Sequence, residues 1–148
     1  MATNLTIDTG LREYNLNGKV TVTFNPTDSI FIGKIYDTFS DLEEKEKEYK
    51  KQMENATAKE VLELSQQLNV EMRGILEDIF GVDVVTPLIG NANVYALAEG
   101  LPVWANILLA IIDELDDASV EEQAKTNARI AYYTKKYQVR DHKRKGSK

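Results

Sequence analysis

Residues 102–115 read PVWANILLAIIDEL, the most apolar stretch of the chain. In a helix, its large apolar side chains would lie on nearly every side: Val103, Trp104, Ile107, Leu108, Leu109, Ile111, Ile112 and Leu115. Such a helix must be covered by its own fold or by a partner. The stretch contains Pro102 and Asn106 and is shorter than the ~20 apolar residues that cross a bilayer, so we expect no membrane span.

Capping signals mark two helices upstream of this stretch. Residues 25–28, Asn-Pro-Thr-Asp, suit the start of a helix, because proline is accepted in a first turn and Thr or Asp caps free amides. The apolar positions that follow recur every three, four or seven residues to about Asn55. Residues 57–60, Thr-Ala-Lys-Glu, form a capping box, and the second helix runs from there to Gly81. Because the linker is short, we expect an antiparallel helix pair.

The segments on either side of the apolar stretch predict shorter elements. Pro87 favours a loop over residues 82–90, and a brief helix is expected over residues 91–99. The acidic residues 113–117 are expected to end the apolar helix. Residues 119–122, Ser-Val-Glu-Glu, form a second capping box, which predicts a new and last helix.

The first 25 residues alternate apolar and polar side chains, which is typical of short β-strands. The apolar members are Leu5 and Ile7, then Tyr14 and Leu16, then Val20, Val22 and Phe24. A two-residue turn at Asn17-Gly18 would put the second and third groups on opposite faces of the sheet. We therefore expect a β-meander with about three loop residues there, and with Gly18 or a neighbour in a left-handed or bulged conformation.

Together these elements predict an α+β fold that is mostly α, with a short N-terminal β-meander followed by about four main helices. A chain of 148 residues fits a single domain, which we place at residues 1–138, with the meander at 1–25 and the helices at 26–138. Residues 139–148 are basic and almost without apolar side chains, so they predict a disordered tail.

Charge is unevenly distributed along the chain, whose formal net charge is −6. Residues 135–148 contain seven Lys or Arg and one Asp, so residues 1–134 carry −12. Nucleic-acid binding draws its affinity from phosphate contacts on a basic face, so this acidic body argues against nucleic acid as the main partner. A solvated end is the favoured interpretation of the basic residues, and contact with RNA or with an acidic partner stays open.

No residue pattern indicates catalysis, a bound metal or a cofactor. Cysteine is absent and the one histidine, His142, lies in the basic tail, so neither a Ser-His nor a Cys-His pair is expected. The acids of residues 113–117 match no calcium loop, and a metal-dependent hydrolase that uses them is kept only as a contrasting hypothesis. Residues 1–9 lack the features of a secretory signal, so we expect a cytoplasmic protein that is not an enzyme.

Binding to other proteins is the function class that remains. Tryptophan is enriched both in cores and in binding hot spots, and the Trp104 side of the apolar helix is favoured as core. For the opposite side, core and partner contact stay equally open, and clustered tyrosines near the end of the fold suit either role. The candidate partner-binding residues are Val103, Trp104, Ile107, Ile112, Tyr132, Tyr133 and Tyr137.

Three segments flank the charged first helix in a characteristic order: Ile7-Asp8-Thr9-Gly10, Phe24-Asn25-Pro26-Thr27-Asp28 and Glu99-Gly100-Leu101-Pro102-Val103-Trp104. Together they resemble the tail assembly chaperones of Gram-positive phages and prophages. The resemblance implies a protein that binds the tape-measure protein, keeps its helices soluble and helps to recruit the tail-tube protein. It also implies a place in the host cytoplasm and absence from the mature particle.

Amphipathic helices can offer an apolar face to a partner's helices without ATP, which fits this role. The same property fits a structural tail or connector protein that is retained in the particle, or a general helical adaptor. A homo-oligomer stays open, and neither a membrane nor nucleic acid is expected as a partner.

Overall fold

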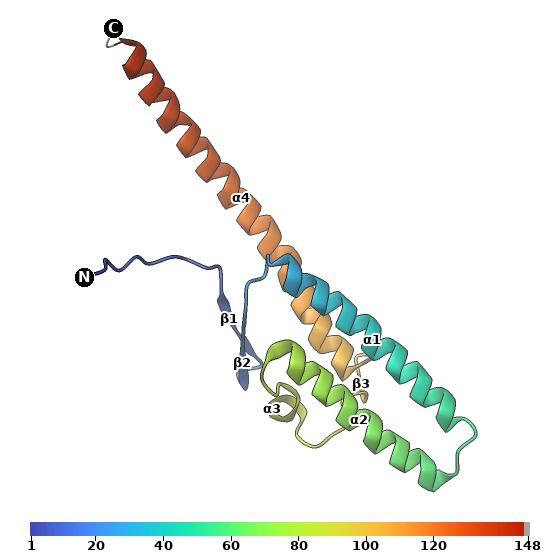
Figure 1. The fold of residues 1–148 in the computed structure, drawn as a ribbon. Helices are drawn as coiled ribbons and strands as arrows, with labels where there is room; N and C mark the ends of the chain where they lie inside the picture. Colours follow the sequence, from blue (N-terminus) through green and yellow to red (C-terminus); the bar gives the residue numbers. More distant parts are fainter. Residues whose placement is uncertain (147–148) are drawn as a thin grey trace.

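The computed structural model describes the backbone of residues 1–146 and the side chains of residues 1–136. The elements are β1 (Arg12–Leu16), β2 (Val20–Phe24), α1 (Ser29–Met53), α2 (Ala58–Phe80), α3 (Val85–Ile89), β3 (Leu97–Ala98), β4 (Leu101–Pro102) and α4 (Val103–Gly146). Figure 1 shows the hairpin, the paired helices and the very long α4. The mostly helical α+β class is confirmed.

The β1–β2 hairpin has the three-residue loop that the sequence predicts. Leu16 pairs with Val20, and the Lys19 amide donates to the Leu16 carbonyl at 3.0 Å. Asn17 and Gly18 take the left-handed conformation, with φ of 54° and 70°. This odd-length loop places the apolar side chains of both strands on one face, which packs against the core.

The first strand of the predicted meander does not form. Leu5 and Ile7 lie in an irregular segment, 80% and 76% exposed, that leads away from the body (Figure 1). The amide of Gly10 donates to Asp8 Oδ1 at 2.9 Å, and Gly10 has a φ of 76°. This turn separates the segment from β1, so the N-terminal sheet is a two-stranded hairpin.

Asn25 joins the N-terminal segment to the start of α1. Its Nδ2 donates to the Thr9 carbonyl at 3.1 Å, and its Oδ1 accepts from the backbone amide and hydroxyl of Thr27 at 2.9 and 3.0 Å. A Cβ atom at Gly10 would lie 2.5 Å from Asn25 Nδ2, so this close approach requires glycine. Asp28 then caps α1 by accepting from the Ile30 amide at 3.0 Å.

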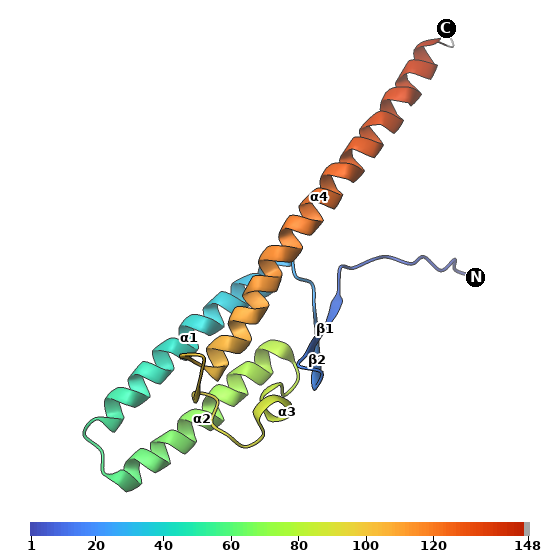
Figure 2. The same ribbon diagram turned by 180° about the vertical axis from the view of Figure 1, so that it is seen from behind.

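The predicted caps of α1 and α2 are confirmed, and the two helices lie side by side and antiparallel (Figure 2). Thr57 Oγ1 accepts from the Glu60 amide at 3.2 Å, and Gly81 ends α2 with a φ of 71°. Across the pair, Glu71 accepts from Lys45 Nζ at 3.1 Å and from the Tyr49 hydroxyl at 2.9 Å.

Two predictions for residues 82–100 are wrong. The loop predicted over residues 82–90 contains the short helix α3, because Asp83 Oδ1 caps the amides of Val85 and Thr86 at 3.0 and 3.2 Å and Pro87 lies in the first turn. The helix predicted over residues 91–99 is replaced by turns and by the small β3–β4 hairpin, whose turn residues Glu99 and Gly100 have φ of 55° and 80°.

The predicted break at residues 113–119 is also wrong, since α4 is one continuous helix. The acids there are accepted in a helix interior, and no Gly or Pro interrupts residues 103–136. Ala118, which directly precedes the predicted cap, is fully buried. The helix also runs through the backbone of residues 139–146, where the sequence predicts a disordered tail, and residues 147–148 lie outside the described residues.

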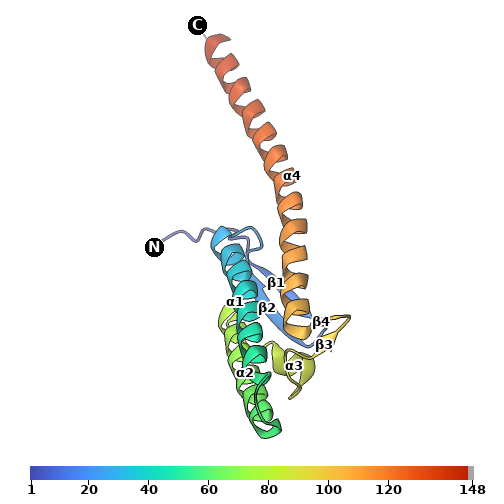
Figure 3. The ribbon, with the colours of Figure 1, turned by 90° about the vertical axis from the view of Figure 1, so that its right-hand side faces the viewer.

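A seam of buried side chains attaches the first half of α4 to the body. Its members are spaced by four and three residues: Trp104, Leu108, Ile111, Leu115 and Ala118, each at most 4% exposed. The next positions on that spacing are Glu122 and Lys125. Burying charges there would cost far more than it gains, so the buried seam ends at Ala118. The rest of α4 projects from the body (Figure 3).

Polar contacts from β1 hold α4 at the point where it leaves. The Tyr14 hydroxyl donates to Glu114 Oε1 at 3.0 Å. Arg12 Nη2 lies 2.5 Å from Glu122 Oε1, and Arg12 Nη1 lies 3.7 Å from Glu121 Oε2. Among the described residues, none of the helices is long and apolar enough to cross a membrane.

Candidate partner-binding surfaces

An open, mostly apolar groove lies at the base of α4, with a volume of about 430 Å³. Its walls come from the hairpin loop, α3, β3 and the first turns of α4. We call it the α4 groove; it is lined by Asn15, Leu16, Asn17, Leu88, Ile89, Ala98, Val103, Asn106, Ile107 and Ala110. A concave, mostly apolar site with a few polar groups is typical of binding sites.

Local hydrogen bonds fix the walls of the α4 groove. Asn106 Nδ2 donates to the Ala98 carbonyl at 2.9 Å, which ties β3 to α4. The amides of Val103 and Trp104 donate to the carbonyls of Ala96 and Val94 at 2.9 and 3.0 Å. These bonds use amides at the start of α4 that have no partner within the helix, so the turn before α4 is held firmly.

Two of the predicted partner-binding residues lie together in the α4 groove. Val103 is half-buried and Ile107 is 8% exposed, and both line its wall. Ile112, predicted for the same surface, is half-buried against the core and does not line the groove. On this side of α4, Val103 and Ile107 therefore line the groove, whereas Ile112 packs against the core.

The predicted partner-binding residue Trp104 lies in the core. It is 2% exposed, and its Nε1 donates to Glu46 Oε1 at 3.4 Å. Its ring meets Phe39 edge-on, with the centroids 5.2 Å apart. Trp104 thus fills the contact between α1 and α4 and offers almost no surface to a partner.

The predicted tyrosines lie on the part of α4 beyond the body. Tyr132 and Tyr133 are 61% and 41% exposed, and their rings meet edge-on at 5.2 Å. The backbone of Tyr137 belongs to α4, but its side chain lies outside the described residues. Tyr132 and Tyr133 therefore form a second surface, separate from the α4 groove.

Sequence reasoning missed the groove residues outside α4. Leu88 and Ile89 belong to the unpredicted α3, and Ala98 belongs to the unpredicted β3. Asn106 offered a usable signal, because a lone amide within a long apolar run usually needs a specific hydrogen-bond partner. Here that partner is the Ala98 carbonyl.

The acidic residues 113–117 do not point to one common site, because α4 places them on different faces. Glu114 accepts from Tyr14, while Asp113, Asp116 and Asp117 are exposed. Burial, and secondarily the hydrogen bond to Glu114, raises the pKa of Tyr14. No three His, Asp or Glu side chains gather as metal ligands in the part of the chain whose side chains are described.

Comparisons of this chain with protein-family models, with curated proteins and with solved structures each find no match.

Proposed function

We propose that the chain is a phage tail assembly chaperone. In this role it binds the tape-measure protein, keeps it soluble without ATP and helps to recruit tail-tube subunits. It acts in the host cytoplasm and is absent from the mature particle.

The three segments that carry the family resemblance support this role through what they do in the fold. The first two are joined by the hydrogen bond between Asn25 and the Thr9 carbonyl. The third contains the turn at Glu99 and Gly100 and the start of α4. The first two segments thus fix the start of α1, and the third places Val103 in the wall of the α4 groove.

The α4 groove is the observation that carries the proposal. It is apolar, open to solvent and built from four separate elements, and it contains the predicted residues Val103 and Ile107. An amphipathic partner helix binds such a groove by placing successive apolar side chains into it. The tape-measure protein would present many such helices.

Co-expression with the tape-measure protein tests the proposal. Ala110→Glu places a charge in the groove at an exposed position of α4, so the variant should fold but lose the ability to keep the partner soluble. Ala128→Glu is the matched control, because it makes the same change at an exposed position of the same helix beyond the body. The soluble fraction of the tape-measure protein and the circular dichroism of each variant are measured.

The outcomes distinguish an error in the location of the binding site from an error in the proposed role. If Ala110→Glu still keeps the partner soluble, the binding site is elsewhere; if the unaltered protein does not raise the soluble fraction, the chaperone role is rejected. Mass spectrometry of purified particles distinguishes the structural alternative, which requires the chain to be present there.

A further inference from the structure

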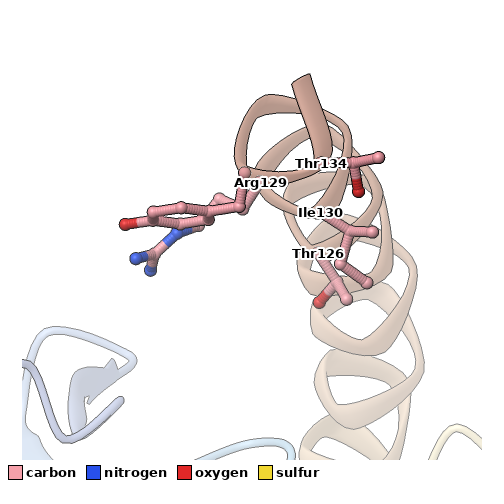
Figure 4. Close-up of a pocket in the computed structure, with 5 residues that line it drawn as sticks. Thr126, Arg129, Ile130 and Thr134 are labelled. Atoms are coloured by element: carbon pink, nitrogen blue, oxygen red, sulfur yellow. The ribbon is translucent and has the colours of Figure 1, made fainter. Parts of the chain in front are cut away.

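The half of α4 beyond the body carries an exposed apolar stripe. Thr126, Ile130 and Tyr133 follow a spacing of four and three residues, so they line up along one face of the helix. Ile130 is 60% exposed and Tyr133 41% exposed, and α4 alone lines this shallow surface. Figure 4 shows Thr126, Ile130 and Thr134 grouped along the helix, with the Arg129 side chain extending away from them to the left.

Positive charge flanks the stripe. Residues 123–136 contain four bases and no acid: Lys125, Arg129, Lys135 and Lys136. The Arg129 guanidinium lies 5.8 Å from the centroid of the Tyr133 ring. This neighbour lowers the pKa of the Tyr133 hydroxyl. The exposed face therefore combines a narrow apolar line with cations on one flank.

We propose that this stripe, defined by Thr126, Ile130 and Tyr133, binds an amphipathic partner helix whose apolar seam is flanked by Asp or Glu. A seam spaced by four and three residues matches the packing of one helix along another. Acids beside the partner's seam would face Arg129, which lies over Tyr133, so charge complementarity selects an acidic partner. Lys125 is already paired with Glu121 and Glu122 of α4, at 3.4 and 3.8 Å. This surface is separate from the α4 groove, so it can be tested without assuming the chaperone role.

A second copy that pairs stripe to stripe fits this face poorly. Because every charged residue between 123 and 136 is positive, pairing two such stripes would place like charges together, whichever way the helices run. Nucleic acid would use the bases but would leave the exposed Ile130 without a role. An acidic helix accounts for both the charge and the apolar stripe.

Three fluorescein-labelled peptides of about 18 residues, the length of α4 from 119 to 136, serve as probes. The first is a helix with a leucine seam and glutamate flanks. The second replaces the glutamates by lysines, and the third replaces the leucines by glutamines. Fluorescence anisotropy with the full chain should show binding of the first peptide alone, weakening as salt is raised.

Variants of the full chain locate the site. Ile130→Ala and Tyr133→Ala should each weaken binding of the acidic peptide by about tenfold, because both side chains lie in the centre of the proposed contact. Val120→Ala is the matched control: Val120 is 74% exposed on α4 but lies off the stripe, and its loss should leave affinity unchanged. All three positions are exposed, so folding should be preserved.

Four results would overturn the proposal. They are failure of the acidic peptide to bind, equal binding of the lysine peptide, and an equal loss of affinity with Val120→Ala. The fourth is an occupant of another kind. It would be shown by a dimer of the chain alone in analytical ultracentrifugation that Ile130→Ala abolishes. It would also be shown by a labelled 20-nucleotide poly(U) that binds more tightly than the acidic peptide and whose binding Ile130→Ala leaves intact.

Discussion

Among the glycines of the described residues, Gly10 is the one at which a Cβ would approach another residue most closely. Its φ of 76° strains any residue with a Cβ, and a Cβ would also lie 2.5 Å from Asn25 Nδ2. We expect Gly10→Ala to lower the free energy of unfolding by about 1–2 kcal/mol, the cost of a left-handed conformation for alanine. Urea unfolding followed by circular dichroism measures this change.

The same substitution elsewhere provides the control. Gly74 lies exposed within α2, and a Cβ there would meet nothing within 4 Å. Gly74→Ala should stabilise the protein by about 0.5–1 kcal/mol, because alanine loses less backbone entropy in a helix. Equal effects of the two substitutions would show that Gly10 is not held in a left-handed conformation against Asn25.

Glu71 makes the pairing of α1 and α2 sensitive to acid. Hydrogen bonds from Lys45 and Tyr49 lower its pKa below the ordinary value of 4.5. Its contribution to stability is therefore present above pH 4.5 and is lost as the pH falls through the lowered pKa of the folded state. We expect Glu71→Gln to be less stable than the unaltered protein at pH 7, with the difference shrinking towards pH 3.

Urea midpoints measured across this pH range test the expectation. Glu63→Gln, at an exposed position of the same helix, is the matched control and should leave the pH profile unchanged. A constant difference between Glu71→Gln and the unaltered protein at every pH would contradict the role of the Glu71 charge.

At the scale of elements, α4 has two halves with different support. Residues 103–118 carry the buried seam, whereas residues 123–136 are all exposed. An isolated helix of that length is marginal in water, because little beyond its own backbone hydrogen bonds holds it. We expect amides 103–118 to exchange with solvent at the slow rate of the core, and amides 126–136 to exchange much faster.

Hydrogen–deuterium exchange with mass spectrometry compares the two halves within one helix. Addition of the acidic peptide should slow exchange in residues 126–136 and leave residues 103–118 unchanged. Equally slow exchange in both halves of the free protein would show that something already covers the second half.

Elements with strong local signals could be predicted from the sequence. The loop at Asn17-Gly18 followed from the requirement that both strands present their apolar side chains to one face. The caps at Asp28 and Thr57 followed from side chains that bond free amides. At these positions the tertiary contacts agree with the local signals, because the apolar face of the hairpin packs against the core and both caps stand at true helix starts.

Elements whose signals are ambiguous could not be predicted. Pro87 marks a loop in many contexts but also suits the first turn of a helix, where α3 places it. The acids before Ser119 resemble a helix end followed by a cap, yet burial of Ala118 favours a continuous helix. The α4 groove depended on α3 and β3, so only its α4 wall was predicted.

At the scale of the whole molecule, charge divides between body and projecting helix. From residue 123 onward the chain contains nine Lys or Arg and one Asp, whereas residues 1–122 carry −14. The two proposed surfaces therefore differ in chemistry: the α4 groove is a depression in an acidic body, and the stripe lies on a basic rod. One partner with two kinds of helix, or two partners, can occupy them together.

The length of α4 determines which of these charges interact with an approaching molecule. At 1.5 Å per residue, the helix from Gln123 to Gly146 extends about 36 Å. The Debye length at physiological ionic strength is about 8 Å, so the far end of the rod is electrostatically screened from the acidic body. A partner that approaches the projecting half of α4 therefore interacts with its positive charge and not with the net charge of −6 of the whole chain. First encounters of acidic partners should therefore begin on the projecting half of α4, and high salt should slow association before it loosens the apolar contacts.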